Sequence, residues 1–470
     1  MSTNEAAHSE LLPPKQRGSM RELAMVALPM VLSMSFDTIM TFVDRFFLSR
    51  LGSEYMNAAL AGGNSQMVLM TFFTGLMSYS TALVAQNLGA GKRDRCASVL
   101  TQTLILGVFS YPLILFLRPA AYLLFDISGI DSRQLAPQIA YFDILIYGSI
   151  ITLFRHSLGC FFSGIGETRI VMVASFAGMF VNVILNYLLI FGNFGFPALG
   201  IEGAAIGTLA GGFAALLILV FRYLCRDIHE RFQTKSLKNW HLRLDVIKTL
   251  VRKGSSSGME MVLNMFAFQC MILLFHGQGL SVATAATIMF SWDMVAYVPL
   301  IGLEIAVMSL VGRYAGAKDR YSANRTTRSA IKLGWIFSVC ALVAFVGFPG
   351  VLADVFKPDT PDLFFGEARP LAVFMIRLAA VYVMINTVMV VFAGALRGVG
   401  DTFWVMIAMA TISWFSVFSL WLSLYVFDLG AKAGWCVLVG LTFLAPIVLF
   451  RRWHSGKSFV LFEKTETQPH

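Results

Sequence analysis

Long apolar runs, separated by short clusters of charged and turn-forming residues, dominate the 470-residue chain. A helical run of about 20 residues crosses the roughly 30 Å of hydrocarbon in a bilayer. Twelve runs reach this length, so we predict an all-α polytopic membrane protein with twelve transmembrane helices. The predicted helices span residues 22–47, 57–86, 97–123, 138–163, 169–192, 200–224, 248–277, 282–312, 329–355, 369–396, 402–427 and 431–450.

A long polar segment in the middle of the chain divides these helices into two groups of six. Nine Lys and Arg residues lie between Arg222 and Lys253. Linkers of this composition join domains rather than cross a membrane. The predicted organisation is an N-terminal tail (1–21), an N-lobe (22–224), a linker (225–247), a C-lobe (248–450) and a C-terminal tail (451–470).

The two halves repeat each other in sequence. Residues 75–95 align with residues 302–322 at a constant offset of 227, and residues 163–168 align with 397–402 at an offset of 234. Six helices separate the copies, so both copies have the same orientation in the membrane. We therefore predict two pseudo-symmetric six-helix lobes related by an axis along the membrane normal.

The distribution of basic residues predicts the orientation. Of the 36 Lys and Arg residues, 27 fall in the two tails and in the loops on the same side as the tails. Because basic residues are enriched in cytoplasmic loops, both termini are expected in the cytoplasm. The first 20 residues are polar and lack the apolar core of a signal peptide. We expect a monomeric, multi-pass protein of the plasma (cell inner) membrane.

Composition excludes several other classes of protein. The chain is 57% hydrophobic and only 13% charged, and its net charge of +9 comes from turns rather than from one helix face, so we expect no nucleic-acid partner. The six cysteines are far apart and lack metal-ligand spacing, which predicts neither disulfides nor a metal site. No nucleophile set or phosphate-binding loop is recognisable, so we expect neither enzymatic activity nor a cofactor.

The first apolar run contains charges that lipid does not tolerate. Asp37 and Asp44 lie seven residues apart, so both side chains lie on one side of the helix. An Asp at the centre of a membrane helix costs about 2.5 to 3.5 kcal/mol on insertion scales, so such acids are candidates for function. The alternative is that one or both are hydrated in the outer headgroup region, where Arg45 extends to the surface.

Several segments carry a resemblance to a known family. They are FVDRFFLSRLG (Phe42–Gly52), LVAQNLGAG (Leu83–Gly91), VNVILNYLLIFG (Val181–Gly192), GIEGAAIGT (Gly200–Thr208), VPLIG (Val298–Gly302) and ALRGVGDT (Ala395–Thr402). The chain from about Arg21 to Arg452 resembles the multidrug and toxic compound extrusion (MATE) family. The resemblance implies alternating access and export of organic, often cationic, compounds in exchange for H⁺ or Na⁺.

The resemblance places a cation-coupling site in the N-lobe. It implies the residues Asp44, Asn182, Asn186 and Thr208, and we add Asp37 as a further candidate. Asn182 and Asn186 are four residues apart, so their amides share one helix face and offer oxygens to a cation or hydrogen bonds to a carboxyl. The alternative is that the two asparagines only bridge helices.

The C-lobe departs from the family pattern. Several subfamilies have an acid where this chain has Asn264, and some have one where it has Asn386, so we do not expect C-lobe coupling as in those relatives. We expect polar and aromatic residues to line a substrate cavity there instead and to attract cations. These are Glu260, Asn264, Trp292, Asp293, Tyr297, Glu304 and Asn386. The alternative is that Glu260 and Glu304 cap or hydrate helix ends.

Two transport functions are compatible with this fold. The first is an antiporter that exports amphipathic organic compounds, and the second is a flippase for a lipid-linked oligosaccharide or another lipid. Several membrane acids and few membrane arginines favour the antiporter. One carboxylate with neutral ligands makes a weak sodium site, and burial favours protonation of Asp44, so we expect coupling to H⁺ rather than Na⁺.

Overall fold

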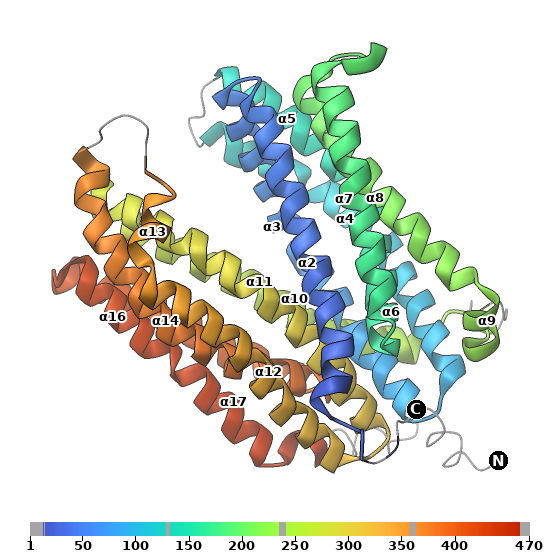
Figure 1. Cartoon of the computed structure of the whole chain (residues 1–470). Helices are drawn as coiled ribbons and strands as arrows, with labels where there is room; N and C mark the ends of the chain where they lie inside the picture. The colour runs from blue at the N-terminus through green and yellow to red at the C-terminus, as the bar shows by residue number, and fades with distance from the viewer. Residues whose placement is uncertain (1–12, 14, 128–131, 235–240, 358–362, 461–470) are drawn as a thin grey trace. The chain divides into compact units, whose positions relative to one another are not determined.

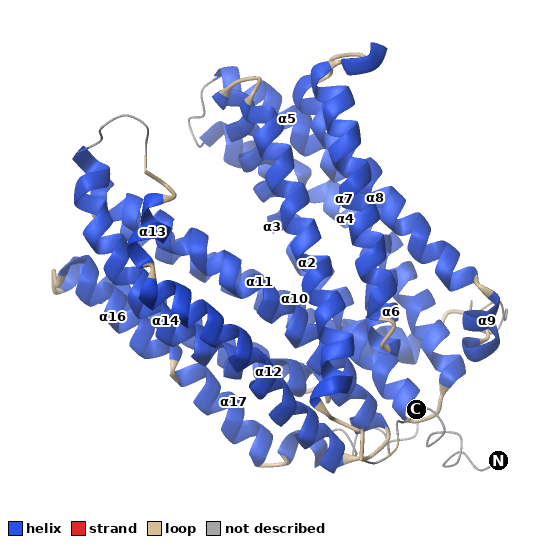
Figure 2. Ribbon diagram, in the orientation of Figure 1, coloured by secondary structure: helices blue, strands red, loops and turns tan. Residues whose placement is uncertain are grey.

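The computed structural model describes residue 13 and residues 15–127, 132–234, 241–357 and 363–460. These ranges contain helices and short connections and no strand (Figure 2). Eleven helices are long and apolar enough to cross a membrane, and a bent pair brings the number to twelve. The predicted all-α membrane fold is confirmed.

The twelve spans follow the predicted order, with helices extended by a few residues at most ends (Figure 1). The ninth prediction, 329–355, is wrong at both ends, because the helix runs from Arg320 to Gly347 and residues Pro349–Asp354 form a separate short helix. The continuous spans are α2 (Met20–Ser49), α3 (Ser53–Gly89), α4 (Arg93–Ile127), α7 (Thr168–Phe191), α8 (Gly200–Leu224), α10 (Leu244–His276), α11 (Leu280–Gly316), α12 (Arg320–Gly347), α14 (Leu363–Gly398) and α15 (Thr402–Trp421). The last span is α16 (Gly430–Thr442) followed by α17 (Leu444–His454). Short elements join them: η1 (Asn193–Gly195), α9 (Arg226–Phe232), α13 (Pro349–Asp354) and η3 (Leu422–Val426).

The fourth predicted helix is broken in two. It consists of α5 (Ser132–Tyr147) and α6 (Ser149–Ile165), which meet at Gly148 with a bend of 48°. A Cβ atom at Gly148 would lie 2.2 Å from the side chain of Leu209 on α8. The break therefore lies where the Leu209 side chain of α8 packs directly against the backbone of Gly148.

The repeated glycine turns have the same backbone conformation in both halves. Gly166 (φ 83°) and Gly400 (φ 84°) end their helices in the left-handed region. Gly91 (φ 74°) corresponds at offset 227 to Lys318, which adopts φ 57° although it has a side chain. The corresponding turns of the two repeats thus share the left-handed backbone conformation, which accounts for their equal spacing in the sequence.

The described residues form two compact units. Unit 1 comprises Leu28–Met259, and unit 2 comprises the described residues of Leu11–Ala27 and Glu260–Pro469. The first turns of α2 thus belong to unit 2 and the rest of α2 to unit 1, with Pro29 just after the division. Likewise, the first half of α10 belongs to unit 1.

Small residues allow close helix packing within each unit. In unit 1, α7 and α8 lie side by side (Figure 1), and a Cβ at Gly211 would be 2.5 Å from the carbonyl oxygen of Gly178. In unit 2, a Cβ at Gly394 on α14 would be 2.8 Å from the carbonyl oxygen of Glu304 on α11. Small residues at helix interfaces are typical of membrane proteins, because packing rather than hydrophobicity holds their helices together.

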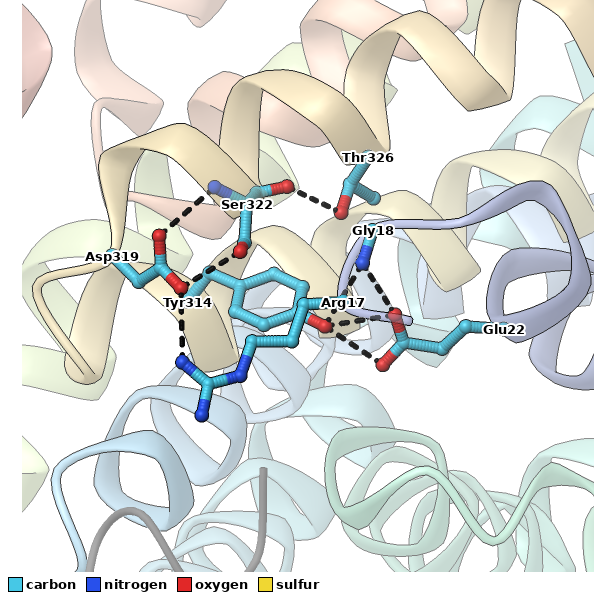
Figure 3. A network of polar contacts seen from close by, with 7 residues as sticks. All are labelled: Arg17, Gly18, Glu22, Tyr314, Asp319, Ser322 and Thr326. Carbon is cyan, nitrogen blue, oxygen red and sulfur yellow. Dashed lines mark hydrogen bonds and ion pairs between the residues drawn. The ribbon is translucent and has the colours of Figure 1, made fainter. Parts of the chain in front are cut away.

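A polar network holds the segment before α2 within unit 2 (Figure 3). The Tyr314 hydroxyl lies 2.8 Å from both carboxylate oxygens of Glu22, and the Gly18 backbone N–H donates to the same carboxylate at 2.7 Å. Nearby, Asp319 accepts hydrogen bonds from the backbone and hydroxyl of Ser322 and pairs with Arg17 at 3.4 Å. Glu22 is 5% exposed and Tyr314 is fully buried.

Asp319 caps the start of α12 as a charged group. Burial opposes its charged form, but hydrogen bonds from the backbone and side chain of Ser322, and from Arg17, outweigh that effect and hold the pKa of Asp319 below its usual value. A carboxylate at a helix N-terminus also interacts favourably with the helix dipole. The network therefore fixes the chain before α2 against the start of α12.

Tyr314→Phe is expected to destabilise unit 2 without changing its hydrophobic packing. The substitution removes the phenol donor and leaves a buried carboxylate with fewer hydrogen bonds, which costs about 1–3 kcal/mol. Thermal unfolding of the purified protein in detergent measures the loss. Tyr321→Phe is the matched control, because Tyr321 is 75% exposed; equal stability of the two variants would contradict this interpretation of the network.

Candidate functional site

Asp44 lies inside unit 1, on α2, with 4% of its surface exposed. Its carboxylate does not face water, so it needs partners from neighbouring helices. Those partners come from α7 and α8, which lie side by side in the same unit. The structure therefore makes Asp44 a buried residue rather than a hydrated one at the headgroup level.

The four residues implied by the family resemblance are in direct contact. The Asn186 amide donates to Oδ1 of Asp44, and the Thr208 hydroxyl donates to Oδ2 at 2.8 Å. Asn186 also donates to the side-chain oxygen of Asn182 at 3.3 Å, and the Asn182 amide lies 3.4 Å from the Thr208 hydroxyl. Both carboxylate oxygens of Asp44 are thus held by neutral donors.

The local sequence explains this arrangement. Asn182 and Asn186 are one helical turn apart on α7, and both are fully buried. Gly207 precedes Thr208 on α8, and a Cβ there would lie 2.2 Å from the side-chain oxygen of Asn186. Glycine at this position gives the Asn186 amide the space that it needs beside Asp44.

Sequence reasoning missed one neighbour of this site. Tyr141 of α5 is 5% exposed, and its phenol lies beside Asp44 and Thr208. Nothing in the apolar run around Tyr141 distinguishes it from an ordinary packed aromatic residue. Its role depends on the position of α5 against α8, which is a tertiary feature.

Asp37 lies outside this group and has a different partner. Its carboxylate pairs with the guanidinium of Arg155 on α6 at 3.3 Å. Both side chains, together with Thr208, line a pocket inside unit 1. Asp37 therefore lines the same pocket as Thr208, whose hydroxyl donates a hydrogen bond to Asp44. The lining includes Met40, Gln66, Leu145, Ile151, Met179 and Leu209.

The pocket has a volume of about 180 Å³ and a mixed lining. Apolar side chains and glycines alternate in the wall with polar groups, which are a carboxylate, a guanidinium, an amide and three hydroxyls. Pockets with a few polar groups on an apolar wall are typical of small-molecule sites.

The residues expected to line a cavity in the C-lobe all lie in unit 2, and four of them lie close to one another. Glu260 of α10 and Glu304 of α11 both pair with Arg397 of α14. The Tyr382 hydroxyl donates to Asp293, and Tyr297 is close enough to interact electrostatically with Glu260, Asp293 and Arg397.

The remaining three candidates make structural contacts or lie half-buried. Asn264 accepts a hydrogen bond of 2.9 Å from Ser413, and the Trp292 indole donates to the carbonyl oxygen of Leu352 at 3.0 Å. Asn386 lies half-buried on α14. Trp292 stacks edge-on against Phe356, so its ring is part of the packing of α11 against the segment that follows α13.

Arg397 is the second residue that sequence reasoning did not assign to a site. It belongs to the ALRGVGDT segment that carries part of the family resemblance. The predicted span ended at residue 396, one residue before Arg397, whereas α14 continues to Gly398 and includes it in its last turn. Its partners are on helices 137 and 93 residues away, beyond the reach of any local pattern.

Comparison with known proteins gives the family. The MatE family model matches residues 29–188 and 257–422, which is most of both halves of the chain. A probable multidrug resistance protein NorM of Pasteurella multocida (strain Pm70) is 25% identical over 467 residues, covering 95% of this chain and 97% of the relative.

Solved structures show the same fold. A MOP superfamily transporter of Pyrococcus furiosus superimposes with a TM-score of 0.86 at 19% identity, covering 98% of this chain and 99% of that chain. The crystal structure of MATE in the bent conformation gives a TM-score of 0.83 at 19% identity over the full length of both chains. The family model, the relative and the two-lobed helical fold agree, and this protein belongs to the MatE family of multidrug and toxic compound extrusion transporters.

Proposed function

We propose that the protein is a secondary active antiporter that exports amphipathic organic compounds, often cations, in exchange for protons. The observation that carries the proposal is Asp44, a buried carboxylate whose described contacts come from neutral groups and whose ligand Thr208 lines a pocket. A buried carboxylate is costly, and binding a cation or a proton removes that cost. Asp44 is therefore suited to bind the coupling ion.

The hydrogen bonds favour a proton over sodium. Sodium would need the carboxylate oxygens of Asp44, but both already accept hydrogen bonds from Asn186 and Thr208. A sodium ion would have to displace these donors and would gain one charged ligand. A proton adds to one carboxylate oxygen without needing a coordination cage, and the Asn186 side chain has an amide oxygen that can accept it after rotation.

Protonation of Asp44 would be transmitted to the pocket through Thr208. The Thr208 hydroxyl donates to the Asp44 carboxylate and also forms part of the pocket wall. When Asp44 is neutral, this hydrogen bond weakens, because bonds to charged groups are stronger than bonds between neutral groups. The negative charge that attracts a cationic compound is lost at the same time, so proton uptake and release of the compound are linked.

Transport by purified protein in proteoliposomes tests this function. Efflux of an organic cation is expected under an inward-directed proton gradient without sodium, and none is expected under a sodium gradient at equal pH on both sides. Asp37→Asn should reduce transport only in part, because Asp37 has its own partner in Arg155. Transport under the sodium gradient alone would exclude proton coupling.

In the proposed orientation the protein lies in the cell inner membrane, and both termini are on its cytoplasmic side. The linker positions around Lys238 are predicted to be cytoplasmic and those around Asp362 to be outside. Both residues lie outside the described residues, so the exposed residues Glu230 and Lys357 near them are used for the test. In a variant without native cysteines, Glu230→Cys should react with an impermeant thiol reagent from the cytoplasmic side only. Lys357→Cys should react from the outside only, and the opposite pattern would reverse the orientation.

A further inference from the structure

One guanidinium and two carboxylates form a charge cluster inside unit 2. Nη2 of Arg397 lies 2.6 Å from Oε1 of Glu260, and Nη1 of Arg397 contacts Oε1 of Glu304. Glu260 is 1% exposed, and the side chains of Glu304 and Arg397 are 15% and 19% exposed. The three residues come from α10, α11 and α14, so the cluster joins three helices of the unit.

The cluster has one negative charge more than its partners balance. A single guanidinium neutralises one carboxylate, and two further titratable groups near it, among the residues that the structure describes, add no positive charge. These are the neutral phenol of Tyr297 and Asp293, which has its own hydrogen bond from Tyr382. An uncompensated charge in a low-dielectric interior is strongly unfavourable.

Carboxylate oxygens of the cluster are available to bind a proton. Oε2 of Glu260 and Oε1 of Glu304 are buried and have no hydrogen bond within the part of the chain that the structure describes, and Nε of Arg397 likewise has no acceptor there. Oε1 of Glu304 has only its ion-pair contact with Arg397. Buried carboxylate oxygens with no donor are uncommon, because an unpaired buried acceptor is unfavourable. The missing positive charge and the missing donors occur in the same pair of carboxylates, and a single proton supplies the charge and one donor.

The internal repeat shows that the fold does not require these charges. At offset 227, Glu260 corresponds to Ser33 and Glu304 to Met77, and at offset 234 Arg397 corresponds to Ser163. In unit 1 these three residues are buried and uncharged. They make weak polar contacts there: Ser33 bonds to Ser175 at 2.8 Å, and Ser163 lies 3.5 Å from the sulfur of Met30.

The same helical positions are therefore filled without charge in one half and with three charges in the other. A purely structural role for the cluster would be met by one carboxylate paired with Arg397, or by small uncharged residues as in unit 1. Such a structural role does not need the second carboxylate. Reversible binding of a proton explains the presence of the second carboxylate better.

We propose that Glu260, Glu304 and Arg397 form a proton-binding site in unit 2 that takes up one proton independently of Asp44. The proton adds to one carboxylate oxygen and makes the cluster neutral. The remaining carboxylate keeps its ion pair with Arg397, while the protonated carboxyl holds the guanidinium less strongly. Proton binding therefore loosens the contact of one of the two helices α10 and α11 with α14.

Infrared spectroscopy of the Asp44→Asn protein tests the site directly. A protonated carboxylic acid in an apolar environment has a C=O stretching band that is distinct from that of a carboxylate and shifts in ²H₂O. The Asp44→Asn protein should show such a band on acidification, and adding Asp293→Asn should leave the band in place, since neither Asp44 nor Asp293 can then contribute to it. The measurement records proton binding and not transport, so its failure leaves the proposed coupling role of Asp44 standing, and the reverse also holds.

Two variants and a control assign the band. Glu260→Gln and Glu304→Gln, each added to Asp44→Asn, should both abolish it, because either change leaves one carboxylate fully paired with Arg397. Glu367→Gln in the same background is the matched control, since Glu367 is exposed in the same unit and should leave the band unchanged. If one of the two variants fails to fold, the other carries the test.

Three results would overturn the proposal. The first is absence of the band in the Asp44→Asn protein, which needs no further variant. The second is persistence of the band after both Glu→Gln changes. The third is loss of the band when Na⁺ is added at constant pH, which would assign the excess charge to a metal cation.

Discussion

Asp44→Asn is expected to abolish gradient-driven efflux while leaving the protein folded. The asparagine has the size of the aspartate and can still accept a hydrogen bond from Asn186 or Thr208, so the packing of α2 against α7 and α8 is retained. It cannot exchange a proton or hold a negative charge. Efflux should fall to the background of cells without the transporter, and the Tm of the purified protein should remain close to that of the wild type.

Asp126→Asn is the matched control for this result. It is the same chemical change in the same unit, but Asp126 is exposed at the end of α4, so transport should be unchanged. Efflux by Asp44→Asn at the wild-type rate would remove the assignment of the coupling site to unit 1. A larger loss with Asp37→Asn than with Asp44→Asn would move the site two turns along α2.

Gly207→Ala adds a single methyl group and is expected to reduce transport strongly. The new Cβ would lie 2.2 Å from the side-chain oxygen of Asn186, so the amide must move away from Asp44. The clash is with the end of a side chain and not with backbone, so the fold should tolerate it. Losing a hydrogen bond to a charged group costs about 1.5–3 kcal/mol, and we expect proton-coupled efflux to fall by roughly 10- to 100-fold.

Two other glycines separate this effect from simple helix packing. Gly159 on α6 has no atom within 4 Å of an added Cβ, so Gly159→Ala should leave efflux intact and stabilise the helix by roughly 0.5–1 kcal/mol. Gly211→Ala should lower the Tm, because its Cβ would lie 2.5 Å from a backbone oxygen that cannot rotate away. If Gly207→Ala lowers the Tm as much as Gly211→Ala does, its effect is on folding.

The hydrophobic pattern was sufficient for the membrane fold because each span satisfies its backbone hydrogen bonds within itself. The order of the twelve spans follows from that pattern, whereas breaks within or beside them, such as those at Gly148 and after Gly347, do not. The break at Gly148 depends on the close approach of Leu209 from another helix, and no property of the apolar run around Gly148 indicates which helix packs against it.

The candidate site was predictable to the extent that its residues lie on single helices. Asn182 and Asn186 share a face because of helical periodicity, and the motif around Asp44 identified the acid. Their contact with Thr208 was inferred from a family resemblance and not from geometry. The partners of Asp37 and of Glu260, and the place of Tyr141, could not be inferred, because each depends on how one helix is positioned against another.

The sequence by itself thus determined the number and order of the spans, the repeat, and which membrane residues carry charge. The tertiary structure alone decided the partner of each charge: neutral donors for Asp44, Arg155 for Asp37, and Arg397 for both Glu260 and Glu304. The reason is physical. Periodicity within a helix depends on local backbone geometry, whereas the depth and rotation of one helix against the next depend on small residues and side-chain packing spread over the whole unit.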